Sequence, residues 1–141
     1  MTRTSRAATV ARYILVAVLL TTGIGHLTFA RDGFQGQVPA WVPLDPDVVV
    51  LASGVVELVF AVALVVLRRR RAAVGWLLAA FFVAIFPGNI SQFVTHTDSL
   101  GLDTDVARGV RLLFQPVLVI VALWSTGAWK LWRERRVTPN H

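Results

Sequence analysis

Residues 48–67 have the sequence VVVLASGVVELVFAVALVVL, and residues 72–94 have the sequence AAVGWLLAAFFVAIFPGNISQFV. The arginines Arg68 to Arg71 stand between the two runs, and the first run contains a single charged residue, Glu57. About 20 helical residues, rising about 1.5 Å each, cross a bilayer core about 30 Å thick. Each run is therefore predicted to be a transmembrane helix, and the arginines to lie at a membrane surface.

Two further apolar runs of similar length lie on either side of this pair. The predicted helices are then about residues 10–30, 48–67, 72–94 and 108–129, with outer loops at 31–47 and 95–107 and a cytoplasmic tail at 130–141. Asp45 followed by Pro46 is typical of a helix start, and Thr104 is the expected cap of the fourth helix. Short loops favour antiparallel neighbours. The sequence predicts an all-α, integral membrane four-helix up-down bundle, with residues 1–141 as a single transmembrane domain.

The first apolar run has an alternative interpretation as a secretory signal peptide. Arg3, Arg6 and Arg12 precede its apolar stretch, and Thr28-Phe29-Ala30 follows it. The stretch is long for a signal peptide and contains Gly25-His26, so we favour a retained helix.

The charges predict the orientation. Cytoplasmic loops carry an excess of lysine and arginine. The acidic residues gather in the two loops at 31–47 and 95–107, whereas the basic residues gather on the other side. Both termini are therefore predicted to be cytoplasmic (N-in, C-in). The basic residues that decide this are Arg3, Arg6, Arg12, Arg68, Arg69, Arg70, Arg71, Lys130, Arg133, Arg135 and Arg136.

The composition excludes several classes of function. The net charge of +6 does not indicate nucleic acid as a partner, because the basic residues flank apolar runs and are better explained by orientation and contact with anionic lipids. The chain has no cysteine, so any redox role requires a bound cofactor or a partner protein. No zinc-binding spacing, phosphate-binding loop or complete set of reacting groups is present. Neither a metal site nor autonomous catalysis is expected.

Polar residues within the predicted spans are the candidates for function. A central charge costs about 2.5–3.5 kcal/mol on insertion scales, so such residues are functional candidates by default. Glu57 is the deepest, roughly 14 Å below the outer boundary, and requires a cationic partner or a proton. Arg111 and His26 are the candidate partners. All the candidates lie in the outer half and are predicted to form one ligand-binding or polar cluster: His26, Ser53, Glu57, Asn89, Gln92, Arg111 and Gln115.

Each of these residues also has a purely structural interpretation. Asn89 and Gln115 lie close to prolines, and their amides can satisfy the backbone groups that proline frees. Arg111 can extend to the head groups, and His26 can bond a loop carbonyl. Glu57 can simply tie the second helix to the fourth.

The remaining half of each predicted helix is almost purely apolar. Lipid does not drive helices together, so contacts between spans rely on small residues. Ala80, Ala84 and Gly88, at four-residue spacing, are predicted to form a contact seam.

Several short motifs occur in an order that resembles the DoxX-like family of small bacterial four-helix membrane proteins over nearly the whole chain. They are Gly25-His26, Phe34, Pro39-Ala40-Trp41-Val42-Pro43, Ser53-Gly54-Val55-Val56-Glu57-Leu58, the arginine run at 68–71, Phe86-Pro87-Gly88-Asn89-Ile90 and Arg111-Leu112-Leu113-Phe114-Gln115. Two positions depart from the pattern. Gly88 stands where the family often has alanine, and Leu113 stands in the stretch where the family often has a proline, with Pro116 following instead.

The resemblance implies a membrane subunit rather than an autonomous enzyme. The family takes its name from a subunit of an archaeal thiosulfate:quinone oxidoreductase, and relatives are described as anchors of oxidative-stress complexes or as binders of sterol-like ligands. The first hypothesis is a non-autonomous subunit in the bacterial inner (cell) membrane. It would bind a quinone or isoprenoid-like lipid in the outer half of the bundle and serve a redox or stress-response partner. Quinone is the one cofactor implied.

Two alternatives stay open. The first is a non-catalytic membrane scaffold or assembly factor, in which the polar cluster is a structural lock. The second is a small proton-linked transporter using Glu57, ranked last because transporters usually have polar groups on both sides of the midplane. The expected partners are membrane lipids, a lipophilic small molecule, and a redox protein or a second copy of the chain.

Overall fold

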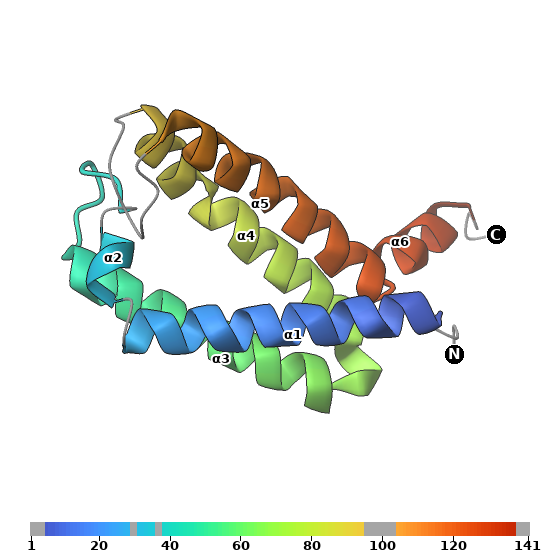
Figure 1. Ribbon diagram of the computed structural model, residues 1–141. Helices are drawn as coiled ribbons and strands as arrows, with labels where there is room; N and C mark the ends of the chain where they lie inside the picture. The colour runs from blue at the N-terminus through green and yellow to red at the C-terminus, as the bar shows by residue number, and fades with distance from the viewer. Residues whose placement is uncertain (1–4, 29–30, 36–37, 95–103, 138–141) are drawn as a thin grey trace.

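The computed structural model describes residues 5–28, 31–35, 38–94 and 104–137 of the chain. Over these residues it has helices and no strand (Figure 1). Four helices, α1, α3, α4 and α5, are long and apolar enough to cross a membrane. The prediction of an all-helical chain with four candidate spans is confirmed. The elements are α1 (Arg6–Leu27), α2 (Arg31–Gln35), α3 (Pro46–Val66), the 3-10 turn η1 (Arg68–Arg70), α4 (Arg71–Val94), α5 (Asp105–Ser125) and α6 (Ala128–Val137).

Polar caps fix where three of the long helices begin. The Asp45 carboxylate accepts a hydrogen bond from the Asp47 amide at 2.8 Å, and Pro46 takes the first turn of α3. The Thr104 hydroxyl accepts from the Ala107 amide at 3.1 Å. Both predicted caps are confirmed. The Ser5 hydroxyl caps α1 in the same way, through the Ala8 amide at 3.1 Å.

Some predicted boundaries need correction. The caps start α1 and α5 several residues before the predicted positions 10 and 108, since helical backbone continues into the polar flanks. α5 ends at Ser125 rather than 129 because Gly127 adopts a left-handed φ of 75°. α6 then occupies most of the predicted tail, and α2 lies inside the predicted loop 31–47. Of the predicted loop 95–107, residues 95–103 lie outside the described part of the chain.

The long helices form two tightly packed pairs, α1 with α3 and α4 with α5. In the first pair, a Cβ on Gly54 would lie 2.8 Å from the Cβ of His26 and 3.0 Å from the carbonyl oxygen of Gly23. In the second pair, a Cβ on Gly75 would lie 2.8 Å from the Cβ of Thr126. Glycine at these two positions therefore lets the helix backbones approach closely.

The prediction of a contact seam on α4 was wrong. Ala80 and Ala84 are exposed, whereas Gly75 and Ala79 are buried against the rest of the protein. Four-residue spacing identifies a helix face but not which face meets a neighbour.

The two pairs lie close together at one end and diverge toward the other (Figure 1). We call the end that contains η1 the arginine end, and the end at which α3 and α5 begin the loop end. The buried apolar cluster lies toward the arginine end and joins α1, α3, α4 and α5. Its members are Leu15, Val16, Leu19, Ala61, Leu64, Val74, Leu78, Ala79, Phe82 and Ala122.

Two buried polar residues, Arg12 and Ser125, lie among the mostly apolar side chains of the arginine end, at 8% and 0% exposure. The Arg12 guanidinium carbon lies 5.7 Å from the Tyr13 ring centroid, within cation–π distance.

Candidate functional site

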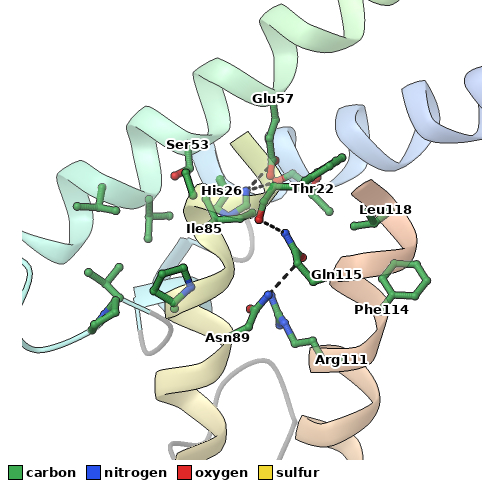
Figure 2. A pocket seen from close by; sticks show the side chains of 18 of the residues that line it. Thr22, His26, Ser53, Glu57, Ile85, Asn89, Arg111, Phe114, Gln115 and Leu118 are labelled. Carbon is green, nitrogen blue, oxygen red and sulfur yellow. Dashed lines mark hydrogen bonds and ion pairs between the residues drawn. The ribbon is translucent and has the colours of Figure 1, made fainter. Parts of the chain in front are cut away.

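A pocket of about 440 Å³ lies between the two helix pairs at the loop end. It is lined by α1, α3, α4, α5 and the segment 38–42 (Figure 2). Its volume is within the range of about 300–1,000 Å³ that is typical of small-molecule sites. Most of its lining is apolar, including Val18, Leu19, Val50, Phe82, Ile85 and Leu118.

Most of the predicted polar cluster lines this pocket. The residues that do so are His26, Ser53, Glu57, Asn89, Arg111 and Gln115. Gln92 is on α4, but its side chain lies outside the described part of the structure. Sequence reasoning missed Thr22 and Trp41 as lining residues. Their signal was weak, because one hydroxyl in a span and one loop tryptophan are common in membrane proteins.

His26 and Glu57 form a hydrogen-bonded pair between α1 and α3. The His26 Nδ1 lies 2.7 Å from the carbonyl oxygen of Thr22 and 3.1 Å from Oε2 of Glu57. A carbonyl oxygen only accepts hydrogen bonds, so the short contact with Thr22 requires a proton on Nδ1. Nδ1 is therefore the donor to both oxygens, and the imidazole ring is held in one orientation.

The direct partner of the Glu57 carboxylate is thus His26. The contact between Gly23 and Gly54 explains this choice, since it brings the backbone of α1 beside α3 one turn from both side chains. Arg111, the other predicted candidate, acts on Glu57 by longer-range coulombic attraction. Both members of the pair are well buried, with side-chain exposures of 12% for His26 and 6% for Glu57.

A second polar chain connects α4 and α5. The Asn89 amide donates to Oε1 of Gln115 at 3.2 Å, and Nε2 of Gln115 donates to the carbonyl oxygen of Phe82 at 2.8 Å. Pro87 has no amide hydrogen, so the α4 hydrogen-bond ladder is interrupted near this carbonyl. Gln115 thus donates a hydrogen bond to the backbone of α4. The structural interpretation had instead assigned it to the backbone of its own helix beside Pro116.

The two walls of the pocket differ in charge. Figure 2 shows Glu57 and His26 meeting from α3 and α1, while Asn89, Gln115 and Arg111 approach from α4 and α5. One wall therefore carries a carboxylate, and the other carries a guanidinium with five N–H donors and two carboxamides. Such an arrangement can hold a polar molecule by hydrogen bonds on opposite sides.

The loop end of the pocket is lined by the segment 38–42. Pro39, Trp41 and Val42 line the pocket there, and Trp41 is 72% exposed. The Arg31 guanidinium of α2 pairs with the Asp47 carboxylate of α3 through two hydrogen bonds. These bonds raise the pKa of Arg31 above its ordinary value. The pair ties α2 to the first turn of α3 and so fixes where the segment begins and ends.

The site offers hydrogen bonds and charge rather than metal ligands. Across the described ranges, no group of three or more His, Asp or Glu side chains is placed to hold a metal ion. A bound molecule would meet the imidazole–carboxylate pair on one side and Arg111 on the other.

Comparison with known proteins yields one match. A family model described as a domain of unknown function (DUF8561) matches residues 15–126, a range that includes every pocket residue named above. No curated protein and no solved structure matches the chain.

Proposed function

The chain belongs to the DUF8561 family of unknown function, and from the geometry of its pocket we propose that it is a multi-pass membrane protein that binds a lipophilic small molecule. The ligand would be a quinone or an isoprenoid-like lipid, held by its polar head. The protein would serve a redox or stress-response partner as a non-autonomous subunit, as its resemblance to DoxX-like proteins implies.

The observation that carries this proposal is the pocket with polar groups on opposing walls. The rest of the lining is apolar, which suits a ring and the first part of a tail. A flat head with an acceptor oxygen at each end, such as a quinone ring, could accept hydrogen bonds from the Ser53 hydroxyl on one wall and from the Arg111 guanidinium on the other. Arg111 is the strongest donor on the α5 side.

The orientation is part of the proposal. Both termini would be cytoplasmic in an up-down bundle in a bacterial inner membrane, supported by the basic residues of η1 and α6 at the arginine end. The pocket would then lie in the outer half of the membrane.

A binding titration tests the proposal. A decyl-tailed benzoquinone is titrated into the purified protein, and bound quinone is measured by absorbance after rapid detergent-compatible filtration. We expect saturable binding to the parent, and binding at least about tenfold weaker in Glu57→Leu and Arg111→Gln. Arg111→Gln loses a charged donor to the head, and Glu57→Leu loses the carboxylate that holds the His26 ring in place; a loss of about 1.4 kcal/mol is a factor of ten. Glu134→Leu and Arg133→Gln on α6 are the matched controls and should bind like the parent. Equal binding by all five proteins would refute the pocket as the site.

The scaffold hypothesis has one supporting observation. The Asn89–Gln115–Phe82 chain and the His26–Glu57 pair are buried links between helices, as a structural lock would require. Under this hypothesis, Glu57→Gln lowers the free energy of unfolding but leaves the affinity for the quinone unchanged.

A further inference from the structure

The helices α3 and α4 touch through aromatic rings on the arginine side of the pocket. The ring centroids of Phe60 and Phe81 are 5.7 Å apart, and the Phe81 and Phe82 centroids are 6.1 Å apart. Phe82 also lines the pocket. Phe82 therefore lies at the boundary between this aromatic contact and the pocket.

Toward the loop end, the same helix faces carry small side chains. Ser53 lies seven positions before Phe60 on α3, and Ala84 lies three positions after Phe81 on α4, so each shares a face with the aromatic residue of its own helix. Both Ser53 and Ala84 line the pocket, and Ala84 is exposed. Beyond the phenylalanines, the wall between α3 and α4 is thus built from a hydroxyl and a methyl group.

Side-chain and backbone contacts close two other walls of the pocket. Between α1 and α3, the contact of Gly23 with Gly54 and the His26–Glu57 pair close the wall. Between α4 and α5, the hydrogen bond from Asn89 to Gln115 closes it.

In a membrane, the side between α3 and α4 would face hydrocarbon rather than water. Val56, three positions after Ser53 on α3, and Val83, next to Ala84 on α4, are exposed at 37% and 59%, in helices long and apolar enough to span a membrane. A molecule that enters the pocket from this side would come from the bilayer interior.

We propose that the pocket opens between α3 and α4, at Ser53 and Ala84 beyond the Phe60–Phe81 contact, and that this opening is a lateral portal through which a single-tailed amphiphile enters head first. The head reaches the polar walls, and the tail stays in the portal and the surrounding lipid. A cavity of about 440 Å³ holds a ring-sized head, so a long tail must extend beyond it. The inference rests on the proposed function, because it names the route and the tail of the same ligand.

The test compares two phenylalanine substitutions on α4. Ala84→Phe places a ring in the portal, and Ala80→Phe places the same ring one turn away at an exposed alanine that does not line the pocket. Two probes are used with each purified protein, a decyl-tailed benzoquinone and the same ring without the tail. We expect Ala84→Phe to bind the tailed probe about tenfold more weakly than the parent, since displacing two methylene groups suffices for that change. The tail-less ring should bind equally to the parent and to both variants.

Each other outcome overturns the inference. If Ala84→Phe and Ala80→Phe bind the tailed probe equally well, the tail does not pass this opening. If Ala84→Phe loses both probes alike, the new ring disturbs the pocket itself and the tail has no separate path. If the parent binds neither probe, the proposed function fails and the portal fails with it, a result distinct from the first two.

Discussion

The loop end and the arginine end of the molecule are built from the same four helices but are held together differently. At the arginine end, apolar side chains such as Leu15, Leu78 and Ala122 fill the space between the two pairs. At the loop end, polar side chains connect the helices within each pair, and a pocket remains between the pairs. Hydrogen bonds and a close glycine contact can thus hold the helices within each pair and still leave room for a ligand between the pairs.

The largest expected effect is on packing at the arginine end. Leu78→Ala removes a side chain with 0% exposure and should lower the free energy of unfolding by about 2–5 kcal/mol, because a cavity remains. Leu118→Ala removes the same atoms beside the existing pocket and should have a clearly smaller effect. The free energy of unfolding of both variants can be measured in mixed detergent micelles. Equal losses would contradict the claim that the two ends are packed differently.

A second prediction concerns the glycine contact that positions the imidazole. Gly54→Val adds atoms where even a Cβ would lie 2.8 Å from His26, so α1 and α3 must separate. We expect a loss of about 1–3 kcal/mol in the free energy of unfolding, as for other overpacked sites. Gly109→Val on α5 is the control, since a Cβ there meets its nearest neighbour at 3.6 Å. A stable Gly54→Val protein would mean that the close contact does not set the position of His26.

The polar chain at the loop end should show a smaller, pairwise effect. A double-mutant cycle with Asn89→Leu and Gln115→Leu should give a coupling of about 0.6 kcal/mol, the average for hydrogen bonds between membrane helices. Zero coupling would indicate that the two amides act independently, and that the spacing of α4 and α5 is set by other contacts.

The smallest effect is expected at the surface of the loop end. Arg31→Gln removes an exposed ion pair with Asp47, and such pairs contribute little and are screened by salt. We expect a slight decrease in melting temperature at low ionic strength that vanishes at high ionic strength. A decrease that persists in high salt would assign the Arg31–Asp47 pair a larger part in holding α2.

Local features of this chain were predictable from the sequence, whereas contacts between helices were not. The four apolar runs and the caps at Asp45 and Thr104 depend on neighbouring residues only, and all are present in the structure. The helix α6 was not predicted, because its charged and aromatic residues are also typical of an irregular tail. The left-handed Gly127, which separates α5 from α6, becomes visible only in the structure.

The candidate cluster shows the same division. The polar residues of the spans could be identified because such side chains are rare in hydrocarbon. The choice of His26 over Arg111 as the partner of Glu57 depends on how α1 and α3 rotate against each other, which Gly23 and Gly54 decide. The contact seam on α4 was likewise mispredicted, since Ala80 and Ala84 have the spacing of a seam but lie exposed.

The most direct measurement is mass spectrometry of the lipid extract from protein purified in mild detergent, for the parent, Glu57→Leu and Glu134→Leu. The account predicts a quinone or isoprenoid-like lipid in near-equimolar amount with the parent and with Glu134→Leu, and its loss from a folded Glu57→Leu protein. Only bulk phospholipid in all three samples would contradict the claim that the pocket at the loop end is a ligand site.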